Sequence, residues 1–379
     1  MKKVLFVATV VKTHIMEFHI PYLKMFKEMG WETAVAARND YESPAACVIP
    51  YCDMYYDIPF ERNPLKLDNL KAYKRLKKVI DEGEYNIIHC HTPVGAMLTR
   101  LSAKQARKRG TRVFYTAHGF HFYKGSPTIN WLLYYPVEKW LSRYTDVFIT
   151  INKEDYERAK TFKGGKVYYV PGVGIDLNKF RTTEDLHKEK RNRLCSEFNI
   201  PNDAIILLSV GEVNKNKNHR VVIEALGKIK CRTIYYIICG RGPLIEEYKE
   251  LSKQLNIEEQ VILAGYRTDV ADFYKAADVF VFPSFREGLP VSVMEAMASG
   301  LPVIATRIRG SSDIVKEKVN GILLEPLDVD GFGKAIIEMC DPKKRKQIFD
   351  ANEAKASEFN LPKILNEYQK IYGEGEKYE

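Results

Sequence analysis

The sequence predicts an α/β protein built from two doubly wound parallel sheets, and three observations lead to this prediction. Short apolar runs rich in β-branched and aromatic residues alternate with helical segments along the chain, as is typical of parallel sheets with helices on both faces. The chain has 379 residues, more than one hydrophobic core usually supports, so two domains are expected. A Pro/Gly turn at 171–176 separates two series of strands, which places the domains at 1–175 and 176–360, followed by a segment at 361–379.

The first series of strands lacks the glycine-rich fingerprint G-x-G-x-x-G after its first strand, so this half is not expected to hold a nucleotide. Its loops are left for another ligand. The expected strands are Val4–Thr9, Glu32–Ala37, Asn86–His89, Val113–Thr116 and Val147–Ile151, and the expected helices are Phe18–Gly30 and Leu67–Glu82.

The second series begins after a charged helix and ends before a last helix that is expected to pack back on the first domain. Its strands are expected at Ile205–Val210, Ile234–Cys239, Val261–Arg267, Val279–Phe282 and Val303–Ala305, and the two flanking helices at Thr183–Phe198 and Leu361–Tyr372.

The stretch from Asp278 to Val315 carries the chemistry of the second series. A buried strand is followed by a short loop and by a helix that starts at Pro290, where a missing N–H costs nothing. Glu287 lies before this helix at the carboxyl end of a strand, where open α/β sheets bind ligands. Glu295 lies among apolar helix residues and needs hydroxyls or a cation as partners. The alternative is that Glu287 is a solvated loop acid and that Glu295 is one half of a salt bridge.

Glu287, seven intervening residues and Glu295, in the setting PSFREGLPVSVMEAMASGLPVIAT, resemble the E-x7-E signature of retaining glycosyltransferases of family 4 (group 1). The resemblance extends along nearly the whole chain. It implies the GT-B fold, in which two Rossmann-like domains face each other across a cleft, and metal-independent transfer from a nucleotide-diphosphate sugar. It also implies that Glu287 contacts the sugar and that Glu295 holds the ribose.

Further residues on the sugar-donor side follow from the same resemblance. Lys217 lies beside a helix start and matches the family's lysine, which would offset charge on the leaving diphosphate. The family usually has an arginine directly after Gly211; Glu212 stands there in this chain, so Lys215 or an arginine from elsewhere is the expected substitute. The other expected contacts are Gly288, Leu289 and Pro290 for the diphosphate and Tyr266 and Arg267 for the nucleobase.

Histidines gather in the loops of the first half. His118 follows a strand and suits proton handling or polarisation of a hydroxyl, and the resemblance implies an active-site position. The alternative is a buried histidine that bonds a loop carbonyl. His14, His19 and Lys124 are assigned to the acceptor side, with surface histidines as the alternative for the first two. His89 and His91 are expected to be structural.

The charge is unevenly distributed. Residues 1–175 hold 27 Lys and Arg against 17 Asp and Glu, a net charge of +10, whereas the remainder holds 31 against 32. A basic half favours an anionic partner, and the alternative is a solvated lysine-rich surface. Trp131, Tyr135 and Trp140 lie near lysines, as in proteins that rest on a lipid headgroup layer, although core packing explains Trp131 and Tyr135 equally well.

Other patterns exclude several classes of protein. The start MKKVLFVATVVKTH is interpreted as a strand rather than a signal peptide, because no small-residue cleavage site follows. No apolar run is long enough to span a bilayer. The seven cysteines show no metal-type spacing and are expected to be reduced thiols of a cytoplasmic protein. Asp328 and Asp330 form a D-x-D, better interpreted as a helix N-cap than as a metal site.

The likeness is closest to bacterial exopolysaccharide and capsule enzymes, in KTHIMEFHIPYLK, TAHGFHFYKG and SVGEVNKNKNH. It implies a UDP-sugar donor, no metal and no other cofactor, and an undecaprenyl-pyrophosphate-linked saccharide as acceptor. The protein is expected in the cytoplasm, peripheral at the inner face of an anionic membrane, without a nucleic-acid partner. Two alternatives remain: a UDP-GlcNAc 2-epimerase, and a non-catalytic component of a polysaccharide assembly complex that only binds the lipid carrier.

Overall fold

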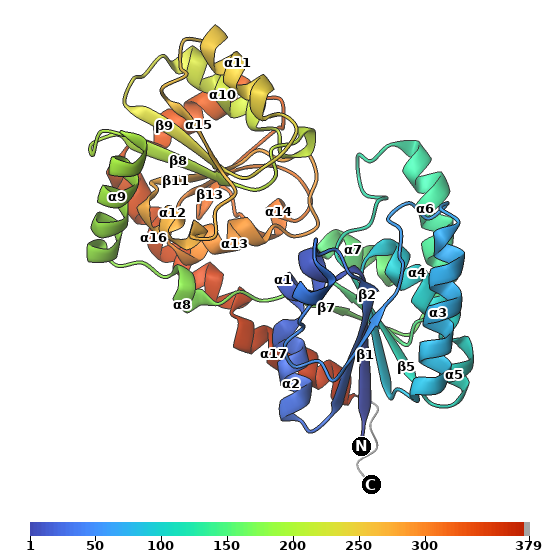
Figure 1. Ribbon diagram of the computed structural model, residues 1–379. Helices are drawn as coiled ribbons and strands as arrows, with labels where there is room; N and C mark the ends of the chain where they lie inside the picture. Colours follow the sequence, from blue (N-terminus) through green and yellow to red (C-terminus); the bar gives the residue numbers. More distant parts are fainter. Residues whose placement is uncertain (375–379) are drawn as a thin grey trace. The chain divides into compact units, whose positions relative to one another are not determined.

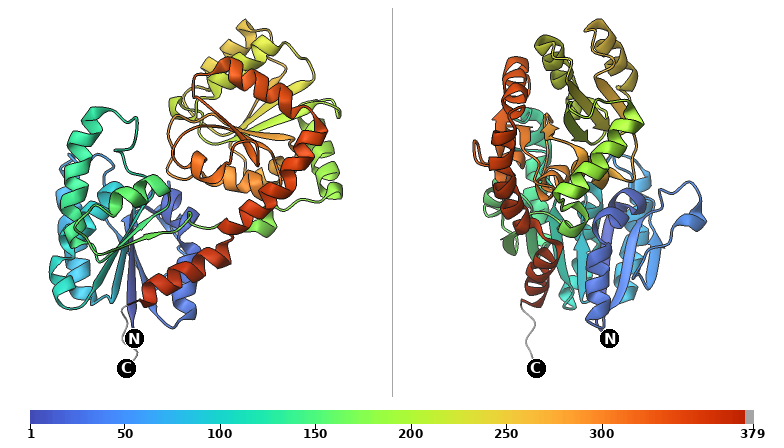
Figure 2. Two further views of the ribbon diagram at one scale, coloured as in Figure 1. Left: turned by 180° about the vertical axis from the view of Figure 1, so that it is seen from behind. Right: turned by 90° about the vertical axis from the view of Figure 1, so that its left-hand side faces the viewer.

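The computed structural model describes residues 1–374, which form two compact units. Unit 1 contains Met1–Val173 and the chain from Leu365 onward, and unit 2 contains Gly174–Ile364 (Figures 1 and 2). The chain therefore leaves unit 1 once and returns to it within its last helix.

Unit 1 is built on a seven-stranded sheet in the order β3-β2-β1-β4-β5-β6-β7. Every pair of neighbours is parallel, so the doubly wound sheet predicted from the alternation of strands and helices is confirmed. The strands are β1 Lys3–Val10, β2 Glu32–Arg38, β3 Met54–Asp57, β4 Ile87–Cys90, β5 Arg112–Ala117, β6 Val147–Thr150 and β7 Lys166–Tyr169.

Helices cover both faces of this sheet: α3, α4 and α5 lie on one side, and α2 and α17 on the other (Figures 1 and 2). The bounds are η1 Val11–Ile15, α1 Met16–Phe18, α2 Ile20–Glu28, η2 Pro44–Ala46, α3 Asp68–Gly83, α4 Pro93–Ser102, α5 Lys104–Lys108, α6 Thr128–Leu141, η3 Ser142–Tyr144, α7 Lys153–Ala159 and α17 Leu361–Gly373.

The predicted single helix Phe18–Gly30 is wrong at its start. The chain leaves β1 through a π-helical turn, η1, and the helix begins again after His19. Pro21 lies in the first turn of α2, where its missing N–H is tolerated, and this favours a new helix start. The break places His14 and His19 close to the carboxyl end of β1.

The last helix completes the core of unit 1. Tyr368 and Tyr372 of α17 are both 2% exposed, and the Tyr372 hydroxyl lies 2.6 Å from His89 Nδ1. The Tyr372 ring also packs against Phe26 and Phe114, on α2 and β5. Helix α17 is therefore an integral part of unit 1.

Unit 2 is built on a six-stranded parallel sheet in the order β10-β9-β8-β11-β12-β13. The strands are β8 Ile205–Val210, β9 Ile234–Cys239, β10 Val261–Gly265, β11 Val279–Phe282, β12 Val303–Thr306 and β13 Gly321–Leu324. Helices α10, α11 and α15 lie on one side, and α12, α13 and α16 on the other (Figure 1).

The helical segments of unit 2 are α8 Leu177–Phe180, α9 Glu184–Phe198, η4 Lys215–Lys217, α10 His219–Ile229, α11 Ile245–Gln254, α12 Val270–Ala276, α13 Val291–Ala298, α14 Ser311–Ile314, α15 Val329–Met339, α16 Pro342–Ala356 and η5 Ser357–Phe359. The expected first helical residue Pro290 is instead the N-cap of α13, because its ψ of 109° is extended.

The D-x-D triplet has a structural role. The Asp328 side chain accepts a hydrogen bond of 2.8 Å from the amide of Gly331 and so caps α15. Asp330 forms a 2.7 Å ion pair with Lys228 of the neighbouring helix α10. The predicted N-cap is therefore confirmed.

Within residues 1–374, the structure contains no helix with the length and apolar character needed to cross a bilayer.

Candidate functional site

Unit 2 brings Lys217 and Glu287 together at the carboxyl edge of its sheet. Lys217 ends the 3-10 turn η4 after β8, and Glu287 lies in the loop after the adjacent strand β11. Lys217 Nζ lies 2.7 Å from Glu287 Oε1, and the two side chains are 21% and 18% exposed. Asn216 Nδ2 donates to the Arg286 carbonyl at 3.0 Å and reaches Glu287 Oε1 at 3.4 Å. The pair is thus held from both loops and still reaches solvent.

Two glycines keep space beside this pair. A Cβ on Gly211, at the end of β8, would lie 3.2 Å from Cε of Lys217. A Cβ on Gly310 would lie 2.4 Å from the Gly288 carbonyl oxygen, and the φ of Gly310 is +82°. Larger residues at these positions would push against the lysine or the loop that carries Glu287.

The start of α13 lies next to Glu287. Gly288 and buried Leu289 lead into the Pro290 cap, which makes no side-chain hydrogen bond to the first turn of α13. A helix N-terminus of this kind attracts an anion, because its first amides have no partner within the helix. Arg309 Nε donates to the Glu287 carbonyl at 3.2 Å, which adds positive charge to the same loop.

Glu295 lies on α13 and is partly buried. The hydroxyl of Tyr274, from α12, donates to Glu295 Oε2 at 2.9 Å. Burial and this nearby carboxylate hold the pKa of Tyr274 well above its usual value. The tyrosine is therefore protonated and fixes one oxygen of a carboxylate that sequence reasoning left without a partner.

The two residues predicted at the nucleobase differ in their surroundings. Tyr266 is 62% exposed, and the Arg241 guanidinium lies 5.1 Å from the centroid of its ring. Arg267 binds Asp269 at 2.8 Å and Glu197 at 2.7 Å, and the hydrogen bond to Asp269 raises its pKa most. Arg267 thus connects α9 to the loop before α12 through two ion pairs.

Glu212, which stands where the family usually has an arginine, is exposed and accepts a 2.6 Å hydrogen bond from Asn214 Nδ2. The expected substitute Lys215 is also exposed. Arg309, which sequence analysis did not single out, is the arginine that contacts the Glu287 loop. Little in the sequence indicated this role, because Arg309 lies in the loop after β12, far along the chain from Gly211.

Unit 1 brings four histidines together: His14, His19, His91 and His118 each have a ring nitrogen within 4.8 Å of those of the others. The histidines lie just beyond the carboxyl ends of β1, β4 and β5, which are adjacent strands. His91 Nδ1 lies 3.2 Å from His118 Nε2.

The alternative of a surface histidine is wrong for His19, which is 1% exposed beside the start of α2. His91, expected to be structural, joins the cluster instead. The sequence signal for His91 was available, because His91 directly follows the buried strand β4, as His118 follows β5. The other expected structural histidine, His89, bonds Tyr372 Oη at 2.6 Å and Thr116 Oγ1 at 2.8 Å, and so has a partner on each ring nitrogen.

Burial determines the charge of the cluster. It lowers the pKa of His118 to about 4 and, with the nearby His118, the pKa of His14 to about 3. Burial also holds the pKa values of His19 and His91 well below their usual value. The four imidazoles are therefore neutral near pH 7. Lys124 is an exposed residue of the loop before α6, and its amide donates to Glu154 Oε1 at 2.6 Å.

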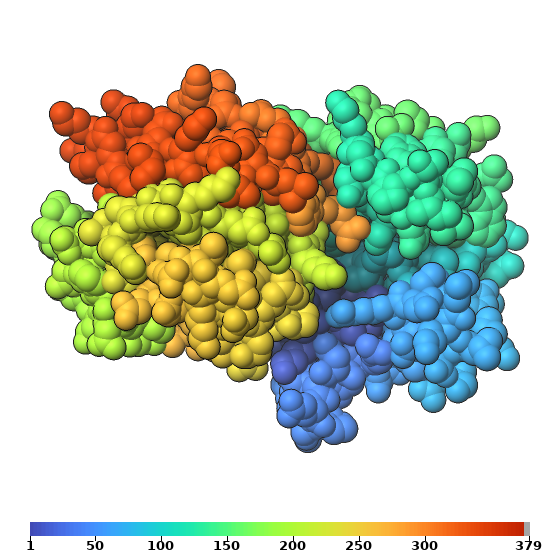
Figure 3. All heavy atoms as spheres, turned by 90° about the horizontal axis from the view of Figure 1, so that it is seen from above, coloured from blue at the N-terminus to red at the C-terminus, as the bar shows by residue number. Residues whose placement is uncertain are grey.

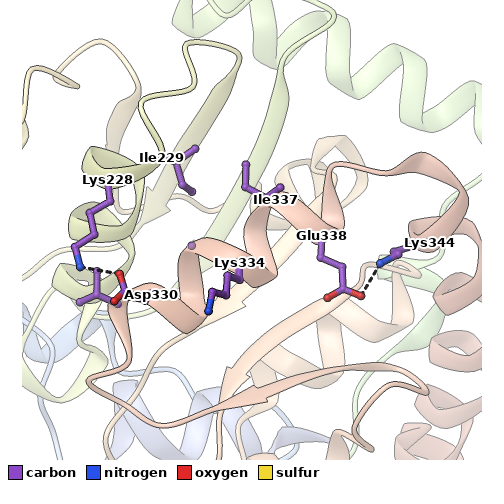
Figure 4. Close-up of a pocket in the computed structure, with 9 residues that line it drawn as sticks. Lys228, Ile229, Asp330, Lys334, Ile337, Glu338 and Lys344 are labelled. Carbon is purple, nitrogen blue, oxygen red and sulfur yellow. Dashed lines mark hydrogen bonds and ion pairs between the residues drawn. The ribbon is translucent and has the colours of Figure 1, made fainter.

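An open surface pocket lies elsewhere in unit 2, between α10 and α15 (Figure 4). Two ion pairs border it, Lys228 with Asp330 at 2.7 Å and Lys344 with Glu338 at 2.8 Å. None of the residues predicted to bind a ligand lines this pocket.

Two parallel-sheet, Rossmann-like units of this kind define the GT-B class of glycosyltransferases, and comparison with known proteins agrees. Residues 3–152 match the family "Glycosyl transferase 4-like", and residues 190–356 match "Glycosyl transferases group 1". EpsD of Bacillus subtilis, which is named as a glycosyltransferase, is 42% identical over 376 residues, or 98% of this chain and 96% of EpsD. The chain belongs to the group 1, or family 4, glycosyltransferases.

A second relative is the Escherichia coli UDP-Gal:α-D-GlcNAc-diphosphoundecaprenol α-1,3-galactosyltransferase, 29% identical over 290 residues, which cover 74% of this chain and 73% of that protein. Among solved structures, HepE of Anabaena in complex with UDP and glucose superposes with a TM-score of 0.79 at 19% identity, over 99% of this chain and 100% of HepE. WaaG, a glycosyltransferase involved in lipopolysaccharide biosynthesis, superposes with a TM-score of 0.73 at 15% identity, over 98% of this chain and 100% of WaaG. These structures establish the fold.

Proposed function

We propose that this glycosyltransferase moves a sugar, with retention of configuration, from a UDP-sugar to a lipid-pyrophosphate-linked saccharide during synthesis of a bacterial surface polysaccharide. Transfer needs no metal ion at the diphosphate. The observation that carries the proposal is the Lys217–Glu287 pair, 2.7 Å apart beside the start of α13.

The pair has the chemistry that such a transfer needs. The bond between the sugar C1 and the diphosphate oxygen breaks as a bond forms between C1 and an acceptor hydroxyl. The attack occurs on the face from which UDP leaves, so the hydroxyl proton passes to the departing diphosphate oxygen, which carries additional negative charge until it receives that proton. Lys217 and the first amides of α13 stabilise that charge in place of a divalent cation. Glu287 accepts hydrogen bonds from the sugar hydroxyls once the substrate takes its place beside Lys217.

Glu295 completes the site for the UDP part of the substrate. Tyr274 fixes one of its carboxylate oxygens at 2.9 Å, and we assign the ribose hydroxyls to this carboxylate. Arg309 is the candidate for the second phosphate contact, because it already lies against the loop of Glu287. The complexes of HepE with UDP and with UDP-glucose support a uridine nucleotide as the substrate class.

Unit 1 is assigned to the acceptor. The Escherichia coli relative is named for a diphosphoundecaprenol-linked acceptor, which supports an acceptor of the same class here. His118 faces the acceptor hydroxyl or the transferring sugar in this proposal. Lys124 and the basic surface of unit 1 attract the pyrophosphate and the lipid headgroups.

Helix α6 supports a position at the inner face of the membrane. Its inner side packs Trp131 and Tyr135 against the core. The basic residues Lys104 and Lys139 lie over the rings of Trp140 and Tyr135, both on this helix. Its outer side forms part of the surface of unit 1 (Figure 3). The exposed apolar side chains are Ile129, Leu132, Leu133, Val137 and Trp140, which are 42–67% exposed. Apolar residues beside lysines are what an anionic bilayer surface binds.

The test incubates purified protein with a panel of UDP-sugars, with and without membrane lipid extract, and follows UDP release and the lipid product. We expect release to depend on lipid, to need no added manganese or magnesium, and to fall at least about 100-fold in Glu287→Gln, as for loss of one group at a developing charge. Unchanged transfer by Glu287→Gln would refute the site. Epimerisation of UDP-GlcNAc in the absence of an acceptor would identify the protein as an epimerase. Binding of the lipid carrier without turnover of any UDP-sugar would identify it as a non-catalytic component.

A further inference from the structure

We propose that His14, His19, His91 and His118 of unit 1 bind one zinc ion. Each contributes one ring nitrogen, and these four nitrogens lie within 4.8 Å of one another. Neutral imidazole is the form that binds a metal, and four nitrogen ligands match the tetrahedral coordination of zinc. All four histidines belong to unit 1, whereas Lys217 and Glu287 belong to unit 2.

The topology of the sheet assembles the four ligands. His91 follows β4 directly, and His118 follows β5, its neighbour in the sheet. His14 and His19 come from the chain that follows β1, which pairs with the other side of β4. The π-helical turn η1 carries His14, and irregular turns of this kind are frequent at functional sites.

Unused hydrogen-bonding capacity points to a ligand. His14 Nε2, His19 Nε2 and His91 Nε2 are buried and have no hydrogen-bond partner among residues 1–374. His19 and His91 are only 1% and 2% exposed. A buried polar nitrogen without a partner is costly, and three of them in one place have a common explanation if they share a cation.

His89 shows that burial alone does not produce this pattern. It is also 1% exposed, and its ring lies 4.1 Å from that of His91. Both of its nitrogens nevertheless have partners in Tyr372 and Thr116. The unpartnered nitrogens are therefore a property of the cluster rather than of every histidine in this region.

The distances fit the ion after a small closure. Two nitrogens that each lie about 2.0–2.1 Å from a tetrahedral zinc ion are roughly 3.3 Å apart. The largest separation is 4.8 Å, so the nitrogens farthest apart must approach by about 1.5 Å to reach the same geometry. His14 and His118 are the partly exposed members of the cluster.

Zinc would define what His118 can do. With Nε2 on the ion, the other ring nitrogen can still donate a hydrogen bond to an acceptor hydroxyl, but the ring can no longer take up a proton. His118 would then orient the hydroxyl rather than deprotonate it. The ion would also tie the segment after β1 to the ends of β4 and β5.

The experiment uses the full-length chain without a histidine tag, stripped of metal and titrated with zinc against a chromophoric chelator. We expect one zinc per chain with a Kd below about 1 μM. X-ray absorption should give a shell of nitrogen ligands at about 2.0–2.1 Å, and cobalt in place of zinc should give the strong visible bands of a tetrahedral site. All three readouts are independent of transferase activity, so they stand or fall separately from the proposed function.

Variants show which residues hold the ion. His14→Gln changes a partly exposed ligand and should weaken zinc binding by at least the roughly 10- to 100-fold that loss of an outer partner costs, while tryptophan fluorescence confirms that unit 1 is folded. His187→Gln is the control, because His187 lies in unit 2 and bonds the Lys275 carbonyl. The proposal is overturned if the wild type binds zinc no more tightly than about 10 μM, if His14→Gln binds as the control does, or if the ligands are sulfur or only oxygen.

Discussion

Lys217 Nζ and Glu287 Oε1 are 2.7 Å apart, although 70 positions of sequence separate the two residues. Adjacent strands β8 and β11 bring them together, because each residue lies in the loop after one of these strands. The pair keeps a positive and a negative group at one sheet edge, where a phosphate and a sugar have to bind side by side.

Lys217→Ala should lower kcat at least about 100-fold, because one group that stabilises a developing negative charge contributes about 2.7–4 kcal/mol. Steady-state release of UDP measures this effect. Lys215→Ala is the matched control, since Lys215 is an exposed lysine of the same turn and should retain nearly full activity. Equal losses in both variants would mean that general positive charge, rather than the position of Lys217, matters.

Glu295→Gln should raise KM for the UDP-sugar roughly 10- to 150-fold, since a hydrogen bond to a charged group contributes about 1.5–3 kcal/mol. Inhibition by UDP and by its 2′,3′-dideoxy analogue tests the assignment to ribose. The wild type should prefer UDP, and the variant should lose most of that preference. If the preference survives the substitution, Glu295 does not hold the ribose.

Replacing Leu132 and Leu133 by glutamate should reduce binding to vesicles that contain anionic lipid by about tenfold or more. Each leucine is more than half exposed on the outer side of α6, and full burial of such a side chain is worth about 1.5–3 kcal/mol. Vesicle sedimentation measures the effect. Leu327→Glu is the control, because Leu327 is 76% exposed in unit 2. Equal binding by all variants would exclude α6 as the contact.

Glu138→Ala should destabilise unit 1 by about 3–5 kcal/mol, because it leaves Arg100 as a buried charge without its partner. The Arg100 side chain is 0% exposed and bonds Glu138 through both terminal nitrogens, at 2.5 and 3.2 Å. All three tryptophans of the chain lie in unit 1. Urea unfolding monitored by tryptophan fluorescence therefore reports on this unit.

Glu82→Ala supplies the comparison. Its ion pair with Lys78 is 3.9 Å long between side chains that are 74% and 67% exposed, and exposed pairs contribute about 0–1 kcal/mol. Similar losses for Glu138→Ala and Glu82→Ala would show that the buried pair has no special role in stability.

Unit 2 should lose stability as the pH falls from about 6.5 toward 4. Burial lowers the pKa of His219 to about 4, so below its usual value of about 6.5 the unfolded chain binds a proton that the folded chain does not. At pH 5 this difference corresponds to about 2 kcal/mol. Hydrogen exchange of peptides from β8 and β9 measures it, and His219→Gln should remove that part of the pH dependence. An equal dependence in the variant would assign the effect to other groups.

The sequence predicted the central strands best. The bounds expected for β8, β9 and β11 agree with the structure, because a strand covered on both faces is a continuous apolar run. The edge strands β3 and β13 were not predicted. The residues of β3 are exposed or partly buried, and those of β13 alternate between buried and partly buried. Strands at the edge of a sheet therefore lack the continuous apolar run that marks a central strand.

The sites were predicted less completely, for a physical reason. Residues such as Glu287 and Glu295 share one loop and helix, so their spacing in the sequence carries information about their spacing in the structure. The histidine cluster does not have this property. Its members follow three different strands, and only the order β1-β4-β5 in the sheet makes them neighbours. Pairs such as Glu295 with Tyr274 depend on helix packing in the same way.

The return of the chain to unit 1 within α17 has a consequence for biosynthesis. Because the strands of unit 1 precede unit 2 in the chain, the socket for Tyr368 and Tyr372 stays open until α17 has been translated. While unit 2 is being synthesised, the apolar site on unit 1 that receives Tyr368 and Tyr372 therefore stays uncovered. A chain that ended after Ile364 would contain all of unit 2 but would lack the part of α17 that completes the core of unit 1.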